Sequence, residues 1–304
     1  MEPFEIQILG CGSALPTTRH NASSQIVKIG NKLHMIDCGE GTQLQLRKYH
    51  IHFQHINNIF ISHLHGDHCF GIIGMVSSFS LLGRTAPLNI YADAMLRKIM
   101  KPQFDFFCKG LNYELIFHDI DATEQCVIYE DSSIIVETLP QNHRLPCCGF
   151  LFREKPKKRH IVGEMMEFYK IPPYMRNSIK EGSDYTTPEG DIIPNSRLTR
   201  EADPSRSYAY CSDTRPCPQN NAIIKGVDLL YHEATFAEDE KARAAETFHS
   251  TALEAATIAK ESDAKRLVIG HFSSRYTDEN ILLNEAKEIF PACELANEGK
   301  IFSL

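Results

Sequence analysis

The seven residues Ser62-His63-Leu64-His65-Gly66-Asp67-His68 carry the strongest signal in the chain, because four metal-binding side chains fall within six residues. They follow the apolar run 58–62, which predicts a buried strand that ends directly at His63. A loop at the end of a rigid strand lets several side chains point at one spot, and imidazole with carboxylate suits zinc or a similar divalent ion. The alternative is a polar loop with incidental histidines, which would explain one histidine but not this cluster.

Three further candidate ligands stand in matching positions, each shortly after a segment with strand composition: His143, Asp213 and His271. Taken singly, each is more often a structural polar residue. Taken with the cluster, they complete a set of seven that would hold a pair of metal ions. Asp213 would bridge both ions, because a carboxylate has two oxygens to offer.

Two histidines outside this set stand near the ends of predicted elements. His249 opens a predicted helix over 251–261, with Ser250 or Thr251 as its cap. We interpret His249 as a general acid whose protonated form is held by Glu233, and His232 as a structural residue. The alternative is that these histidines only brace loops. His20 lies near the Gly10–Gly12 loop and is the one other histidine that deserves a closer look.

The order of elements predicts a mixed α/β protein. Apolar segments with strand composition alternate with helical segments, and both halves of the chain look alike in plan. This suggests sheets packed face to face with helices outside. From 153 to about 206 the apolar periodicity fades, prolines accumulate and charge rises. We interpret that segment as an extended insertion rather than core.

Composition narrows the class of protein further. The net charge is -7 and the pI about 6.1, which argues against broad, non-specific nucleic-acid binding. No run approaches the roughly 18 apolar residues of a membrane helix, and the N-terminus lacks the pattern of a secretory signal. The ten cysteines include no CxxC pair and read as reduced, mostly buried thiols. A cytoplasmic protein is therefore expected.

The HxHxDH loop, followed by a lone His, a lone Asp and a final His, resembles the metallo-β-lactamase superfamily. That resemblance implies a four-layer αββα sandwich with metals at the edge between the sheets. Further motifs resemble the ribonuclease Z family, the tRNA 3′-end endonucleases, in its short form. These motifs are GCGSALPT (10–17), DCGEGTQ (37–43), SHLHGDHCFG (62–71), SDTR (212–215), HEATF (232–236), HST (249–251) and GHFSSRY (270–276).

The ribonuclease Z resemblance implies a role for each motif residue. The expected cofactors are two Zn²⁺ ions, although Mn²⁺ or another divalent ion is possible. The first ion would take His63, His65, His143 and Asp213, and the second Asp67, His68, Asp213 and His271. Asp67 would also be the general base, and His249 would protonate the leaving oxygen. The substrate would be precursor tRNA, and the protein a homodimer with one metallo-β-lactamase-like domain over 1–304.

The resemblance also places a flexible, tRNA-clamping arm at 153–200. A basic run begins that segment, and its expected RNA-contacting residues are Lys155, Lys157, Lys158 and Arg159. The alternative for such a run is a solvated loop. Many family members carry Pro-Pro-Gly-Pro in the arm, whereas this chain has Pro172-Pro173-Tyr174-Met175, so the Gly-Pro step is missing.

Two other functions would use the same motifs. The first is a phosphodiesterase of the same fold that acts on a small substrate such as a cyclic nucleotide. Such an enzyme would have little use for a basic arm. The second is an RNA-binding protein whose metal site serves structure only. That protein would bind RNA without cleaving it.

Overall fold

The computed structural model describes residues 2–304 and separates into two compact units. Residues 2–153 and 206–304 form the larger unit, here called the body. Residues 154–205 form the smaller unit, here called the arm. The arm is thus a single insertion between two strands of the body.

The body contains two seven-stranded sheets. In spatial order, the first consists of β18 (Ile301–Ser303), β1 (Phe4–Gly10), β2 (Ser24–Ile29), β3 (Lys32–Ile36), β4 (Ile56–Phe60), β5 (Leu88–Ala92) and β6 (Leu115–Asp119). The second consists of β17 (Cys293–Leu295), β16 (Leu267–Gly270), β15 (Leu229–Glu233), β14 (Ser207–Cys211), β9 (Cys148–Glu154), β8 (Ile134–Pro140) and β7 (Val127–Glu130). In each sheet four neighbouring strands are parallel, β3 to β6 and β14 to β17, so the two halves share a plan as predicted.

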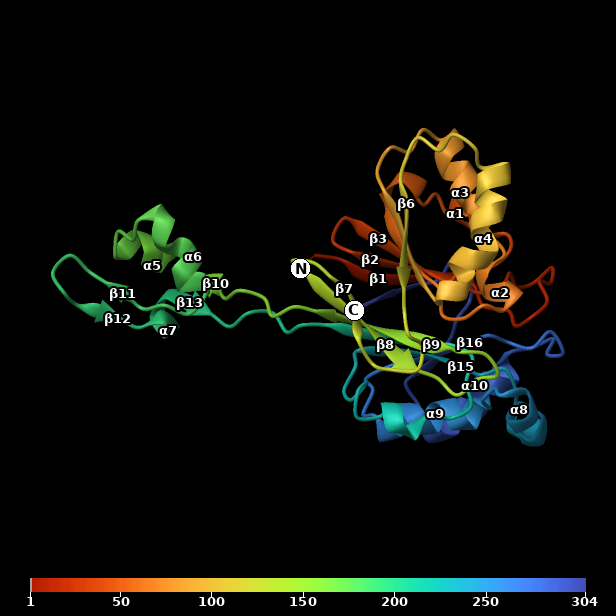
Figure 1. Cartoon of the computed structure of the whole chain (residues 1–304). Helices are drawn as coiled ribbons and strands as arrows, with labels where there is room; N and C mark the ends of the chain where they lie inside the picture. Colours follow the sequence, from red (N-terminus) through yellow and green to blue (C-terminus); the bar gives the residue numbers. More distant parts are fainter. Residues whose placement is uncertain (1) are drawn as a thin grey trace. The chain divides into compact units, whose positions relative to one another are not determined.

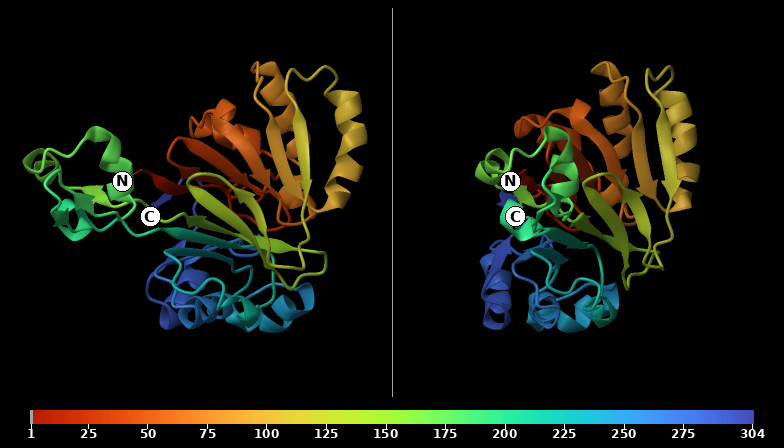
Figure 2. Two further views of the ribbon diagram at one scale, coloured as in Figure 1. Left: turned by 60° about the vertical axis from the view of Figure 1, so that its left-hand side comes forward. Right: turned by 90° about the vertical axis from the view of Figure 1, so that its left-hand side faces the viewer.

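Helices cover the outer face of each sheet (Figures 1 and 2). The first sheet carries α1 (Thr42–Lys48), α3 (Ile72–Leu81) and α4 (Ala94–Phe107). The second carries α8 (Lys241–Thr247), α9 (Ala252–Glu261) and α10 (Asn280–Ile289). The result is the predicted four-layer αββα sandwich.

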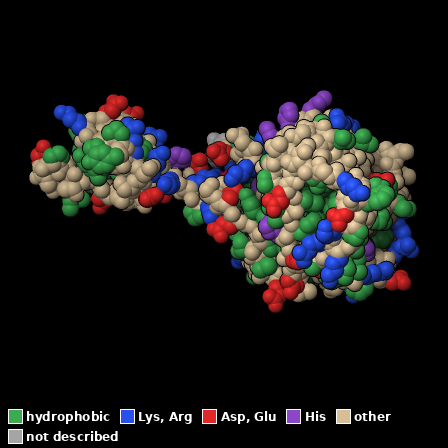
Figure 3. Space-filling model, turned by 45° about the horizontal axis from the view of Figure 1, so that its top comes forward, with side chains coloured by type: hydrophobic (Ala, Val, Ile, Leu, Met, Phe, Trp, Pro, Cys, Tyr) green, Lys and Arg blue, Asp and Glu red, His purple; other side chains and the backbone are tan. Residues whose placement is uncertain are grey.

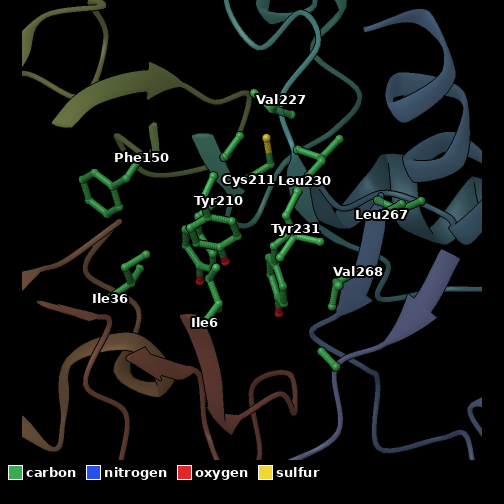
Figure 4. Packing of buried hydrophobic residues seen from close by; sticks show 14 of the residues in the cluster. Ile6, Ile36, Phe150, Tyr210, Cys211, Val227, Leu230, Tyr231, Leu267 and Val268 are labelled. Carbon is green, nitrogen blue, oxygen red and sulfur yellow. The ribbon is translucent and has the colours of Figure 1, made fainter. Parts of the chain in front are cut away.

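The two sheets are joined by a continuous apolar core (Figure 4). Ile6 and Ile36 from the first sheet face Phe150, Tyr210 and Tyr231 from the second, and all five are buried. Strands that are buried on both faces have few polar residues, which is why they read as short apolar runs in the sequence. This packing fixes the spacing of the two sheet edges that carry the candidate ligands.

The loop after β4 begins earlier than predicted. The strand was expected to reach Ser62, but it ends at Phe60. The Ser62 N–H donates instead to the Asp37 carboxylate at 2.8 Å, and the Ser62 carbonyl accepts from the Cys148 N–H of the second sheet at 3.1 Å. The backbone just before the histidines is therefore held by both sheets.

Two helices follow within and after the HxHxDH loop. A short α2 (Gly66–Cys69) precedes α3, and the chain bends at Phe70–Gly71. A Cβ on Gly71 would lie 2.2 Å from the Gly39 carbonyl oxygen, so this close approach of two loops requires glycine.

The arm has a small core of its own, which the fading apolar periodicity of this segment did not indicate. Its buried apolar side chains are Met166, Ile171, Ile179, Tyr185, Ile193 and Leu198. They come from α5 (Gly163–Phe168), the turn after it, α6 (Arg176–Lys180), β11 (Tyr185–Thr186), β12 (Ile192–Ile193) and α7 (Asn195–Leu198). The arm also contains β10 (His160–Ile161) and β13 (Thr199–Arg200), which pair with each other. Elements this short show no apolar period in the sequence. Figure 3 shows Lys and Arg side chains around an apolar patch on the arm.

All ten cysteines are free thiols and nine of them are buried, as predicted. None of the helices within residues 2–304 has the length and apolar character needed to span a membrane.

Candidate metal centre

The fold brings all seven candidate ligands to one edge of the sandwich. The carboxyl ends of β4, β14 and β16 lie there, as does the end of β8, and each is followed by a loop that carries part of the set. Loops at the carboxyl ends of parallel strands are the usual place for a ligand site, because neighbouring strands end side by side. The candidate ligands are His63, His65, Asp67, His68, His143, Asp213 and His271.

Four of these side chains form a first group. The ligand atoms of His63, His65, His143 and Asp213 all lie within 4.8 Å of one another. His63 Nε2 is 3.0 Å from His65 Nδ1, and His143 Nε2 is 3.2 Å from the same atom. Asp213 contributes Oδ2, which is 3.5 Å from His63 Nε2. Three imidazoles and one carboxylate make a donor set that zinc favours.

A second group lies on the other side of Asp213. The ligand atoms of Asp67, His68 and His271 lie within 4.8 Å of one another. Asp213 Oδ1 is 3.3 Å from His68 Nε2 and 3.2 Å from His271 Nε2. One carboxylate therefore offers Oδ2 to the first group and Oδ1 to the second, which is the arrangement expected of a bridging ligand.

The buried atoms of the second group fit a metal ion. His68 Nε2, His271 Nε2 and Asp213 Oδ1 are buried and have no hydrogen-bond partner within residues 2–304. One buried, unsatisfied polar atom costs about 1–3 kcal/mol, so three around a single point need a common partner. In the first group, burial and the neighbouring His68 lower the pKa of His63 well below its usual value. His63 is therefore the neutral imidazole that a metal ion requires.

A buried hydrogen-bond network holds His68 in place. His68 Nδ1 donates to Asp37 Oδ2 at 2.7 Å, and the Tyr210 hydroxyl of β14 donates to the same oxygen at 2.7 Å. A carboxylate behind a ligating histidine fixes its tautomer and strengthens it as a ligand. Sequence reasoning missed both residues. Asp37 directly follows a strand, and that position could have marked it as a candidate site residue. Tyr210 cannot be distinguished in the sequence from an ordinary core aromatic.

Backbone groups orient two other ligands. His143 Nδ1 donates to the Phe248 carbonyl at 2.9 Å, which leaves Nε2 facing the first group. The Ala14 N–H donates to Asp67 Oδ2 at 2.8 Å. The Gly-rich loop after β1 thus reaches the metal centre through its backbone.

His249 and Glu233 form the predicted pair beside the centre. His249 Nδ1 lies 2.8 Å from Glu233 Oε1, and Glu233 is fully buried. Burial alone would lower the pKa of His249, but the Glu233 carboxylate outweighs it and raises that pKa to about 9. The His249 ring stacks on His271 with centroids 5.4 Å apart. A protonated imidazole is therefore held at the edge of the second group.

The structure also places three other residues that the sequence singled out. Thr251 caps α9, and its hydroxyl accepts from the Glu254 N–H in a capping box. His232 is buried in β15 and its Nδ1 lies 2.7 Å from the Glu233 carbonyl, so it braces the strand. His20 does lie against the Gly10–Gly12 loop, with its Nδ1 3.3 Å from the Cys11 thiol.

Most of the basic residues expected to contact RNA form ion pairs within the arm. Three of the four expected RNA contacts are paired with carboxylates inside the arm: Lys157 with Glu154, Lys158 with Glu181, and Arg159 with Glu201. Lys158 and Arg159 also line a groove of about 940 Å³ together with Lys170, Arg176 and Lys180. Within the described chain, Lys170, Arg176 and Lys180 form no ion pair. Sequence reasoning missed these three because they are scattered.

The fold and this arrangement of ligands define a hydrolase of the metallo-β-lactamase class. Solved structures agree with the fold. Human tRNase Z, short form, superposes with a TM-score of 0.71 over 98% of each chain at 24% identity. A long-form RNase Z from yeast gives 0.69 over 99% of this chain and 42% of its own at 20% identity.

Close relatives identify the family. Ribonuclease Z of Bacteroides fragilis is 58% identical over the whole of both chains, and that of Porphyromonas gingivalis is 52% identical over 98% of each. The chain therefore belongs to the ribonuclease Z family and is a hydrolytic nuclease. A family model described as anti-Pycsar protein Apyc1 also matches residues 4–155. That match covers the HxHxDH loop but ends before Asp213, His249 and His271.

Proposed function

We propose that this protein is an endoribonuclease that removes the 3′ trailer from precursor tRNA. The tRNA would keep a 3′-hydroxyl and the trailer would carry the 5′-phosphate. The observation that carries the proposal is the seven-ligand centre with the His249–Glu233 pair beside it. This arrangement occurs in a chain 58% identical, over its full length, to a protein named ribonuclease Z. The small-substrate phosphodiesterase is the less favoured reading.

The ligand groups would hold two Zn²⁺ ions, with Mn²⁺ or another divalent ion as a possible substitute. The first ion would be held by His63, His65, His143 and Asp213, and the second by Asp67, His68, Asp213 and His271. Two such ions lower the pKa of a water molecule and neutralise phosphate charge. Asp67 lines a cavity beside the two ligand groups, where its carboxylate would accept the proton of the attacking water.

The leaving group needs a proton, and His249 is placed to supply it. Water attacks phosphorus, the bond between phosphorus and the 3′-oxygen breaks, and that oxygen takes the proton. Nδ1 of His249 faces Glu233, which leaves Nε2 to face the cavity that it lines. The buried Glu233 carboxylate also accepts from the Thr214 and Thr235 N–H groups, so it is held rigidly behind the imidazole.

We expect His249→Ala to slow precursor cleavage by about 10²–10⁴-fold, the usual contribution of a general acid. The loss should nearly vanish with a substrate whose 3′-bridging oxygen is replaced by sulfur, because a thiolate leaves without a proton. Single-turnover rates on the oxygen and sulfur substrates would measure the effect. Equal losses on both would show that His249 does not protonate the leaving group.

Glu233→Gln should slow precursor cleavage less than His249→Ala does. The amide keeps the size of the side chain but loses the negative charge that keeps His249 protonated. We expect about a 10–100-fold loss on the oxygen substrate, as for other groups that orient a reacting residue, and again recovery with sulfur. A loss of bound metal in this variant would instead assign Glu233 to the stability of the centre.

The arm, residues 154–205, is proposed as the substrate-binding element. Its groove collects five Lys and Arg side chains, and Lys170, Arg176 and Lys180 have no ion pair in the described chain. Cations already paired with carboxylates must give up that pairing to bind phosphate, whereas these three need not. We therefore assign the main phosphate contacts to this unpaired trio, with Lys155, Lys157, Lys158 and Arg159 as weaker contributors.

Neutralising the unpaired trio, as Lys170→Gln, Arg176→Gln and Lys180→Gln together, should weaken tRNA binding and flatten its salt dependence. Each cation that no longer binds a phosphate should reduce the slope of log K against log salt by about 0.7–0.9. The matched control neutralises the paired trio of Lys157, Lys158 and Arg159. Filter-binding titrations at several salt concentrations would measure both variants. A larger effect from the paired trio would contradict the assignment.

The proposed oligomeric state and cellular location follow from family membership. We propose a homodimer, which light scattering would show as twice the chain mass of 34.5 kDa. We also propose a cytoplasmic location. The ten free thiols support it, because an oxidising compartment would favour their pairing.

A further inference from the structure

The cavity beside the metal centre is lined by two chemically different sets of residues. It holds about 480 Å³, within the range of sites for small ligands. Candidate metal ligands make up one set, and the other consists of Leu15, Pro16, Ala22 and Phe70, here called the apolar wall. Among its described lining residues there is no Lys or Arg, and the charged side chains that are not candidate ligands are Glu40 and the protonated His249. Such a wall suits a neutral, flat group rather than a second phosphate.

Phe70 stands out on this wall because it is both exposed and firmly supported. Its side chain is 66% exposed and that of Leu15 is 68% exposed. Single exposed apolar residues are common and need no special explanation. However, a Cβ on Gly66 would lie 2.3 Å from the Phe70 ring, so the ring packs directly against the backbone of the HxHxDH loop. The position of Phe70 is therefore tied to that of the metal ligands on either side of Gly66.

We propose that Phe70, together with Leu15, binds the base of one unpaired nucleotide next to the scissile phosphodiester. This inference rests on the proposed function and adds a requirement for a base at that position. The scissile phosphate would lie at the metals, so the adjoining base reaches the apolar wall. Stacking on an aromatic ring accepts every base, and it needs a base that is free of its helix. An unpaired nucleotide at the cut would thus be selected without a sequence preference.

The test combines a protein change with a substrate change. Precursor tRNA is made with an abasic site at the last tRNA nucleotide, at the first trailer nucleotide, or at neither. Wild type should lose roughly tenfold in kcat/KM on one of the two abasic substrates. Phe70→Ala should lose roughly tenfold on the intact substrate and nothing further on that abasic substrate. Phe70→Tyr should restore the wild-type pattern, because it keeps the ring.

The matched control is Phe106→Ala, which removes an equally exposed aromatic of α4 that does not line the cavity. It should leave all three rates unchanged. The proposal is overturned if Phe70→Ala cuts the intact precursor as fast as wild type does. It is also overturned if Phe70→Ala loses as much kcat/KM on the abasic substrate as on the intact one, so that the two losses multiply. Zinc content is measured alongside, and Phe70→Leu replaces the alanine variant if alanine loses metal. If wild type does not cut the intact precursor, the proposed function itself fails.

Discussion

Replacing Asp213 by Asn is expected to remove both metal ions and to slow precursor cleavage at least about a thousandfold. Asp213 Oδ1 lies 3.2–3.3 Å from two ligand atoms of one group, and Oδ2 lies 3.5 Å from His63 Nε2 of the other. An amide of the same shape has only one oxygen and no charge. Neither group would then have a full set of ligands, and the repulsion between two close cations would be unshielded.

The measurement is metal content per chain by mass spectrometry, together with single-turnover cleavage. His271→Ala serves as the comparison, because it removes a ligand from one group only and should cost mainly one ion. Asp119→Asn is the surface control, since Asp119 is exposed and, among residues 2–304, forms its one ion pair with Arg97 at 2.6 Å. If Asp213→Asn retained one tightly bound ion and lost the other, Asp213 would belong to a single site.

Removing the arm should separate substrate binding from chemistry. The Ser205 hydroxyl donates to the Lys155 carbonyl at 3.2 Å, so the two ends of the arm are adjacent and a short Gly-Ser linker can replace residues 156–204. The body keeps its own core, because the arm packs its six buried apolar residues among themselves. We expect kcat/KM on precursor tRNA to fall by about a hundredfold or more, because the deletion removes most of the cations proposed to bind phosphate.

Hydrolysis of bis(p-nitrophenyl) phosphate should continue at nearly the full rate in the same deletion variant, and its zinc content should stay at two ions. These two readings are the internal control, since they report on the metal centre alone. Retained cleavage of precursor tRNA would move substrate binding onto the body. Loss of the small-substrate activity would show instead that the arm supports the metal centre.

Where the chemistry is local, the sequence identified candidate ligands that the structure brings together. Four of the seven ligands lie in one short loop, and the others follow strands whose apolar runs are easy to recognise. The pair of Glu233 and His249 was also found, because each stands at the end of a predicted element. Element ends were less accurate: β4 stops at Phe60, and the Ser62 N–H donates to the carboxylate of Asp37, which directly follows β3.

The arm shows where local patterns fail. Its core residues are separated by turns and lie in elements of two to six residues, so no helical or strand period emerges. The basic run at its start was expected to contact RNA, but side chains brought close by folding neutralise much of it. The unpaired cations Lys170, Arg176 and Lys180 lie apart in the sequence and meet only in the folded arm.

By itself, then, the amino-acid order determined the kinds of ligand, the loops that carry them and the two-sheet plan, because each depends on neighbouring residues and their periodicity. The tertiary structure alone decided which Asp213 oxygen serves which group, how Tyr210 and Asp37 brace His68, and that Phe70 lies on Gly66 beside the metals. Those relations depend on distances between side chains from separate strands and loops. Such distances are set by the packing of one sheet against the other, which no local pattern records.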